Sequence, residues 1–286
     1  LFPPPSPNWC PHGRTLSKLL RREPPSFVLD VGSFDGRDAI AFGKAGHRVW
    51  SFEPSPGKVD PIRERVASVG LALNVTVFPY AISNASGTAP FVVNRAGAGA
   101  KRMFRGELGS AQDGLGKALW RVDNQTAAVV QVPVRTLDAL VPSSEDVLLL
   151  KVDAQGFDYH VLLGAEKLLA AKRIRRVIAE LMPLHMPGGA QAGVHMVSFL
   201  NRLGYACVRC NGPAERAFLH GRVSVLKYAT ELARREKGIS NRGVNFGRWD
   251  DIVCEATGVE PAAESPRAPT GIGRSSKMRL RHKRNS

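Results

Sequence analysis

Residues 27–54 have the sequence FVLDVGSFDGRDAIAFGKAGHRVWSFEP, which predicts a buried strand, a glycine turn, a short helix and a second strand ending in a carboxylate. We expect strands over residues 27–31 and 48–53 and a helix from Gly36 to about Ala45. In a parallel strand-helix-strand unit, a ligand binds at the carboxyl ends of the strands, and an acidic residue on the second strand accepts hydrogen bonds from ribose hydroxyls. The stretch therefore predicts half of a nucleoside-binding sheet.

The turn in this unit favours a cationic nucleoside over a dinucleotide. A nicotinamide or flavin site needs G-x-G-x-x-G so that a pyrophosphate can sit at the helix N-terminus, whereas this turn is Gly32-Ser-Phe-Asp-Gly36. Asp30 and Asp35 would repel a pyrophosphate. They suit S-adenosylmethionine, which carries a sulfonium and an ammonium, and Glu53 is placed to bind its ribose. The alternative is that Asp30 and Asp35 only cap the helix.

The composition predicts one catalytic domain with irregular ends. With 286 residues and 43% hydrophobic content, the chain can bury one sizeable core. We expect an N-terminal extension over 1–26, a catalytic domain over 27–255 and a basic, disordered tail over 256–286. No apolar run approaches the ~20 residues that span a bilayer, so a soluble protein is expected. The chain begins with Leu1 rather than Met, as in a fragment or a processed product, so compartment and oligomeric state stay open.

The positive charge is concentrated at the C-terminus. The net charge is +15, and residues 267–286 hold seven Lys or Arg and no acidic residue, which leaves +8 for the rest. This tail could bind nucleic acid, an anionic surface or a targeting receptor, or it could be a solvated extension. A basic tail does not make a nucleic-acid enzyme, and we expect no specific nucleic-acid partner. The positive body favours an anionic substrate without identifying it.

Cysteines and glycosylation motifs give weaker signals. Cys207-Val-Arg-Cys210 has zinc-knuckle spacing, but no second C-x-x-C or paired histidines follow. We therefore expect ordinary, partly buried thiols at the four cysteines rather than structural zinc. The N-glycosylation pattern occurs at Asn74-Val-Thr76, Asn84-Ala-Ser86 and Asn124-Gln-Thr126, and it matters only if the protein enters the secretory pathway. Asn74 opens an expected core strand and is a poor acceptor.

Downstream of residue 54, apolar runs and helical periodicities alternate, which predicts a doubly wound sheet. Expected strands span 75–82, 89–93, 129–134, 146–153, 176–181 and 205–209, and expected helices span 59–69, 137–140, 157–171 and 193–203. The run DVLLLKVD is nearly all apolar, as in a strand buried on both faces of a parallel sheet, and it ends in Asp153 at the crevice. Residues 95–116 predict a loop that either folds over a substrate or is a surface insertion.

Several of these elements together resemble the FkbM family of class I methyltransferases. They are the 27–54 unit, the segments VRTLD (134–138) and LKVDAQGFD (150–158), and IAEL (178–181). In that family the fourth strand has the form K-I-D-x-E-G-x-E, with T-L-D before it and a strand bearing E-L or E-x-H after it. The resemblance covers about residues 27–205.

The resemblance implies a fold and a reaction. The implied fold is α/β: a Rossmann-like, doubly wound, mostly parallel seven-stranded sheet with helices on both faces. The implied activity is S-adenosylmethionine-dependent O-methylation of a small-molecule, sugar or lipid-like acceptor. Gln155 stands where the family commonly has Glu, which puts a general-base role at that position in doubt, and Asp158 replaces a common Glu. Fold similarity alone does not name the acceptor.

We assign the expected cofactor site to five residues. Asp30 and Gly32 serve the amino-acid end of the cofactor, Gly36 the close turn and Glu53 the ribose. The backbone of Ala81, after the third strand, serves the adenine.

Three residues are candidates for catalysis. Asp153 is the best placed to orient the acceptor or to take its proton, and Glu180 and His185 are secondary candidates. Asp153 could instead be a helix N-cap, and His185 an ordinary surface residue. Asp153 and Glu180 could bind a divalent ion, but no dense carboxylate cluster supports this, so no metal is expected.

Two other functions stay open. A catalytically silent nucleoside-binding protein, with its basic tail as the working part, stays open because Gln155 stands where the family commonly has Glu. A nicotinamide-dependent oxidoreductase is disfavoured by the spacing of the glycine turn.

Overall fold

The computed structural model describes part of the chain: residue 16 and residues 20–94, 114–115, 127–183, 185–210, 222–233, 240–241, 244–245 and 250–258. The predictions for Asn124, for nearly all of the 95–116 loop and for the basic tail after residue 258 lie outside these residues, whereas Ala256, which was expected to open the tail, is the last residue of a strand.

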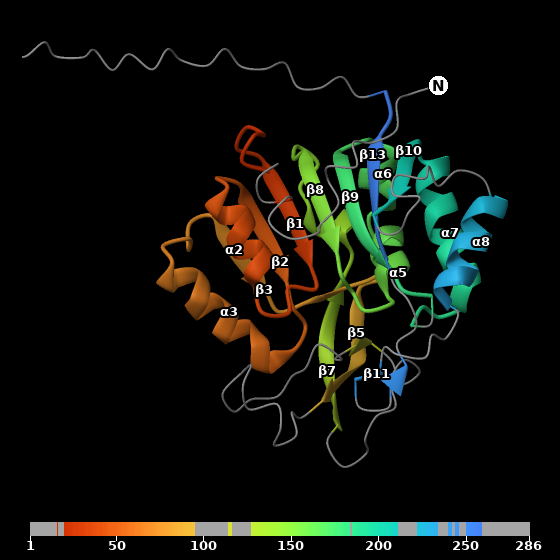
Figure 1. The fold of residues 1–286 in the computed structure, drawn as a ribbon. Coiled ribbons are helices and arrows are strands. Elements are labelled where there is room, and N and C mark those ends of the chain that lie inside the picture. Colours follow the sequence, from red (N-terminus) through yellow and green to blue (C-terminus); the bar gives the residue numbers. More distant parts are fainter. Residues whose placement is uncertain are drawn as a thin grey trace, which may run out of the picture.

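A seven-stranded sheet forms the centre of the molecule (Figure 1). Its strand order is β10-β13-β9-β8-β1-β2-β3, and every strand runs in the same direction except β13. The strands are β1 (Phe27–Val31), β2 (Arg48–Phe52), β3 (Val75–Phe78), β8 (Val147–Val152), β9 (Ile174–Leu181), β10 (Tyr205–Arg209) and β13 (Asp250–Ala256). All five residues of β1 and all six of β8 are buried, as expected for central strands covered on both faces.

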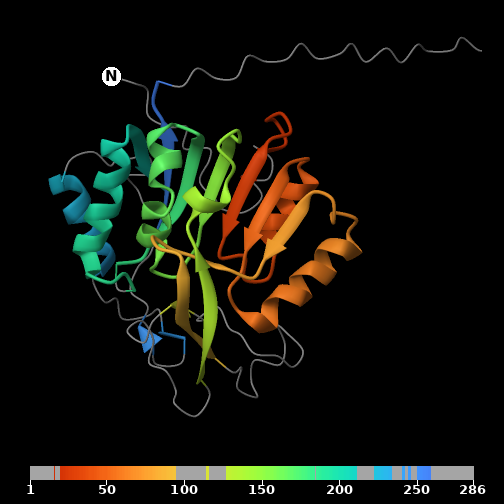
Figure 2. The ribbon, with the colours of Figure 1, turned by 180° about the vertical axis from the view of Figure 1, so that it is seen from behind.

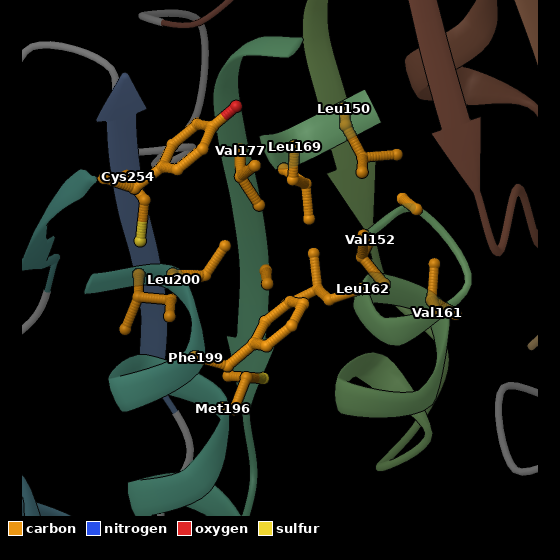
Figure 3. Close-up of a cluster of buried hydrophobic side chains, with 14 of the residues drawn as sticks. Leu150, Val152, Val161, Leu162, Leu169, Val177, Met196, Phe199, Leu200 and Cys254 are labelled. Carbon is orange, nitrogen blue, oxygen red and sulfur yellow. The ribbon is translucent and has the colours of Figure 1, made fainter. Parts of the chain in front are cut away.

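Helices cover both faces of this sheet. The helices are α2 (Arg37–Lys44), α3 (Pro56–Ser68), α4 (Leu137–Leu140), α5 (Asp158–Leu163), α6 (Glu166–Ala170), α7 (Gly189–Arg202) and α8 (Arg222–Ala233). One hydrophobic cluster joins the sheet to α2 and α3, and a second joins it to α4, α5, α6, α7 and α8. Figure 3 shows part of the second cluster, where Leu162 and Phe199 project from their helices toward Val177 of β9. The predicted doubly wound α/β fold is therefore confirmed.

A second, smaller sheet extends beyond the carboxyl ends of β1 and β8 (Figures 1 and 2). It has four strands in the order β4-β7-β5-β6. They are β4 (Ala81–Ile82), β5 (Gly87–Asn94), β6 (Gly114–Leu115) and β7 (Ala127–Arg135), and they pack around a small core of their own. A two-stranded sheet of β11 (Ser240–Asn241) and β12 (Val244–Asn245) completes the described elements.

Two predicted elements are each divided in the structure. The strand expected over 75–82 ends at Phe78, and β4 then joins the smaller sheet. The helix expected over 157–171 is interrupted between α5 and α6, where a Cβ atom on Gly164 would lie 2.0 Å from the carbonyl oxygen of Ser83. A long-range backbone contact therefore sets this break, and helical periodicity cannot reveal it.

The packed domain also includes residues that the sequence placed outside it. Leu20 is completely buried, and Leu16 is 6% exposed; both join the cluster that holds α2 and α3. The carboxylate of Glu23 accepts from Arg176 at 3.1 Å. Part of the expected N-terminal extension thus packs against the domain.

The prediction of free thiols was wrong for the three cysteines that the structure describes, and Cys10 lies outside the described residues. Cys207 and Cys254 form a disulfide, and Cys210 is also disulfide-bonded. The physical reason is the antiparallel pairing of β10 with β13, which the sequence did not predict and which sets Cys207 directly opposite Cys254 with their Cα atoms 4.0 Å apart.

Candidate active site

Two positions in the turn after β1 have a backbone conformation and surroundings that only glycine fits. Gly32 and Gly36 have φ angles of 84° and 75°. A Cβ atom on Gly32 would lie 1.9 Å from the carbonyl oxygen of Asp153, and one on Gly36 would lie 2.6 Å from the side chain of Ile62. The turn after β1 is therefore packed directly against the end of β8, so that the predicted cofactor turn and the predicted catalytic aspartate share one edge of the sheet.

Glu53 follows β2 and faces the same turn. It is 4% exposed. Its Oε2 accepts from the backbone N–H of Phe34 at 2.8 Å, and its Oε1 accepts from the N–H of Ser55 at 2.9 Å. These two hydrogen bonds fix the orientation of the Glu53 carboxylate at the turn. The position suits a carboxylate that accepts from ribose hydroxyls.

Asp35 is used within the protein. Its carboxylate accepts from the backbone N–H of Arg37 at 3.1 Å and also pairs with the Arg37 guanidinium. Arg65 lies 3.9 Å from the same carboxylate. This favours the capping role that the sequence left open for Asp35.

A buried lysine holds three carboxylates together beneath the turn. Lys151 of β8 has its Nζ 3.6 Å from Asp30, 3.1 Å from Asp38 and 3.7 Å from Asp153. Asp30 is completely buried, and its Oδ2 accepts from Ser51 at 3.3 Å, whereas its Oδ1 has no hydrogen bond. The local balance is one cation against three anions.

Burial and the neighbouring charges shift the pKa values of Asp30 and Lys151. Complete burial raises the pKa of Asp30 to about 6, although Lys151 acts in the opposite direction. Burial lowers the pKa of Lys151, but Asp30, Asp153 and Asp38 together raise it well above its ordinary value. Lys151 therefore stays an ammonium. The sequence reasoning missed it, although one lysine inside the apolar run DVLLLKVD was a usable signal, because a buried charge requires partners.

Asp153 and Glu180 are brought together at the ends of β8 and β9. The side chain of Asp153 is 39% exposed. The amide of Gln155 donates to Asp153 at 2.7 Å and lies 3.5 Å from Glu180. Burial, reinforced by Asp153 and Asp158, raises the pKa of Glu180 well above its usual range. Gln155 therefore supplies a donor between two acids where a glutamate would add a third negative charge.

Asp158 accepts hydrogen bonds from the backbone around Asp153 and Glu180 and so helps to fix its conformation. It is completely buried. Its carboxylate accepts from the N–H groups of Gly156 at 3.1 Å and Glu180 at 3.2 Å. Burial, with a smaller contribution from Asp153, raises the pKa of Asp158 to about 7.

We expect the stability of the protein to fall as the pH rises from about 4 to about 7. The pKa of Asp158 is higher in the folded protein than in the unfolded chain, so its contribution to stability is complete below the unfolded pKa and is lost as the pH rises through the folded one. The loss from this residue is on the order of 4 kcal/mol. Urea unfolding of Asp158→Asn at pH 5 and pH 8 should show a smaller difference than the unaltered protein. If the stability differed between pH 5 and pH 8 by the same amount in both proteins, the raised pKa of Asp158 would be contradicted.

The remaining predicted residues take different positions. His185 is 4% exposed, and burial lowers the pKa of its side chain, which keeps it neutral. A Cβ atom on Gly156 would lie 2.5 Å from the His185 carbonyl oxygen, so this histidine flanks the turn after β8. Ala81 is buried and pairs with Val134 of β7. It thus belongs to the smaller sheet and follows β3.

The described residues do not form a metal site. No group of three or more His, Cys, Asp or Glu within them is arranged to hold a metal ion. None of the described helices is long and apolar enough to cross a membrane.

The donor set fits S-adenosylmethionine. A glycine turn, a carboxylate placed after the second strand and three carboxylates around one lysine suit a nucleoside with a cationic end. The seven-stranded, mostly parallel sheet is the fold expected of a class I methyltransferase. The model of the methyltransferase FkbM domain matches residues 30–207, and the chain belongs to this family. S-adenosylmethionine is the cofactor.

Solved structures resemble this one at low sequence identity and with TM-scores below 0.5. The FkbM methyltransferase from Methylobacillus flagellatus is 14% identical, with a TM-score of 0.45 over 74% of this chain; this chain covers 46% of that one. The O-methyltransferase TomG from Streptomyces achromogenes, solved with S-adenosylmethionine, is 15% identical, with a TM-score of 0.42 over 87% of this chain and 80% of its own. An rRNA methylase from Streptococcus thermophilus is 11% identical, with a TM-score of 0.42 over 84% and 93% of the two chains. No curated protein matches the sequence.

Proposed function

We propose that this protein methylates a hydroxyl oxygen of a small-molecule, sugar or lipid-like acceptor, with Asp153 as the group that receives the hydroxyl proton. The observation that carries the proposal is the position of Asp153. Its carboxylate is accessible at the end of a central strand, and its backbone packs directly on the cofactor turn at Gly32. A group so placed is within reach of an acceptor that meets the cofactor at this edge.

The chemistry needs alignment and a proton acceptor. S-adenosylmethionine supplies a methyl group on a sulfonium, so the new C–O bond forms as the C–S bond breaks. The acceptor hydroxyl loses its proton to Asp153, and the products are a methyl ether, S-adenosylhomocysteine and a protonated carboxyl group. The protein aligns the acceptor oxygen with the methyl carbon and excludes water that would compete for it.

The two acids near the acceptor take different roles in this proposal. Asp153 lies 3.7 Å from the ammonium of Lys151 and accepts from Gln155, and its side chain is 39% exposed, so it can reach an acceptor. Burial instead raises the pKa of Glu180, which favours its neutral form. We assign Asp153 as the proton acceptor, and Glu180 and His185 as groups that shape the pocket.

Binding and transfer test the proposal separately. Calorimetric titration of the full chain should show saturable binding of S-adenosylmethionine and none of NAD. Labelled methyl transfer into a cell extract, followed by fractionation, should place the label in a small-molecule or lipid fraction. Label in RNA would contradict the acceptor class. Binding without any transfer would indicate a silent binding protein, and binding of NAD alone would indicate an oxidoreductase.

Removing the carboxylate of Glu53 should weaken the binding of the cofactor. Glu53→Ala loses the group proposed for the ribose and also releases the N–H groups of Phe34 and Ser55. We expect a loss of about 1 to 3 kcal/mol, which corresponds to roughly 5- to 160-fold in Kd, measured by calorimetry. Glu53→Gln keeps one acceptor oxygen and should lose less. Unchanged affinity in both variants would remove Glu53 from the site.

A further inference from the structure

The disulfides have a consequence for where the protein folds. Cys207 and Cys254 are both completely buried, and their disulfide joins two neighbouring strands of the main sheet. Cys210 is disulfide-bonded as well, so every cysteine in the described residues is oxidised. Disulfides form and persist in oxidising compartments, whereas the cytosol keeps thiols reduced. A disulfide built into the core of an enzyme domain thus points to an oxidising compartment.

The N-glycosylation motif at Asn84 is exposed, so a glycosyltransferase could reach it. Asn84, Ala85 and Ser86 are all exposed, and they form the bend between β4 and β5. The Asn84 side chain accepts from the neighbouring Ser83 hydroxyl at 3.2 Å, which is a local interaction. An exposed bend with a small middle residue leaves the asparagine amide accessible.

The N-glycosylation motif at Asn74, in contrast, is partly buried. Asn74 is half-buried in the turn before β3, and both of its backbone polar groups are engaged. Its N–H donates to Leu71 at 2.9 Å, and its carbonyl accepts from Val49 at 2.7 Å. Val75, the middle residue of the motif, is 4% exposed. Modification at this position would require the edge of the sheet to open, so Asn74 serves as an internal comparison for Asn84.

We propose that this protein folds in an oxidising compartment of the secretory pathway and carries an N-linked glycan on Asn84. The two parts rest on different observations, the buried disulfide and the exposed motif. Neither depends on the identity of the methyl acceptor. Asn84 also lies outside the group of residues assigned to the cofactor and to catalysis, so a glycan there is compatible with an active enzyme.

The first arm of the test measures the oxidation of the cysteines. The full-length protein is expressed with a tag in cells of the organism it comes from. It is then denatured and treated with a thiol-reactive polyethylene glycol, which adds to free thiols. Without reductant, we expect no change in electrophoretic mobility. After reduction, several polymer chains should be added. Reactive thiols at Cys207 and Cys254 before reduction would overturn the proposal that the protein folds in an oxidising compartment.

The second arm measures the glycan. Treatment with an N-glycosidase should increase the mobility of the protein, and this shift should disappear in Asn84→Gln and in Ser86→Ala. Ser86→Thr preserves the motif and should keep the shift, and Asn74→Gln should leave it unchanged. Thermal unfolding of each variant confirms that the fold is retained. A shift that persists in Asn84→Gln, or no shift in the unaltered protein, would overturn the assignment of Asn84, and this result is independent of methyl transfer.

Discussion

Lys151→Met should destabilise the protein by about 3 to 5 kcal/mol at pH 8, because the substitution leaves a completely buried carboxylate without its cation. Methionine preserves most of the volume and the unbranched shape of the lysine side chain. The loss therefore reports the charge rather than a cavity. Urea unfolding of the full chain with its disulfides intact measures the change in the free energy of unfolding.

The pH dependence of this loss distinguishes charge from packing. Without Lys151, the pKa of Asp30 should rise further above the value of about 6 that burial already produces. Below that pKa the carboxyl group is neutral, so the penalty should be smaller at pH 5 than at pH 8. The double variant Lys151→Met, Asp30→Asn removes the buried charge and should recover much of the stability. A penalty below about 1 kcal/mol at pH 8, or no recovery in the double variant, would contradict a charge-based role.

Asp153→Asn should reduce kcat by about 10²- to 10⁴-fold and change the Kd for S-adenosylmethionine only slightly. Asparagine keeps an oxygen that can accept from Gln155, so the local geometry is retained, but it cannot take a proton. Single-turnover kinetics with a labelled methyl group measures the chemical step, and calorimetry measures the affinity for the cofactor.

Glu180→Gln is the matched control for Asp153→Asn. Burial already favours the neutral form of Glu180, so an amide there changes the charge of the site less. We expect a smaller loss of kcat than for Asp153→Asn. The reverse order would reassign the proton acceptor to Glu180, and a loss of affinity without a loss of turnover would place Asp153 in cofactor binding.

Local patterns predicted the parts of the fold that depend on neighbouring residues. The turn from Gly32 to Gly36, the apolar strand before Asp153 and the alternation of strands with helices follow from residue type and spacing. The structure confirmed the mostly parallel sheet that they imply. The carboxyl ends of parallel strands meet at one edge, so placing Glu53 and Asp153 at the same edge of the sheet needed no coordinates.

Contacts between distant residues decided the rest. The helix break at Gly164 comes from the backbone of Ser83, and Lys151 acquires its role only where the first turn of α2 brings Asp38 over the sheet. No periodicity within either segment carries this information, because the partners are far apart along the chain.

The sequence by itself predicted the class of fold, the cofactor and the edge of the sheet where the site is expected, because each prediction depends on short patterns of residue type and spacing. Only the tertiary structure decided which carboxylates share a lysine, how Gln155 separates two acids and which cysteines meet. Those outcomes depend on strand register and on packing across the sheet. The antiparallel β13 is the clearest case, since its register alone brings Cys254 opposite Cys207 and turns two expected thiols into a disulfide.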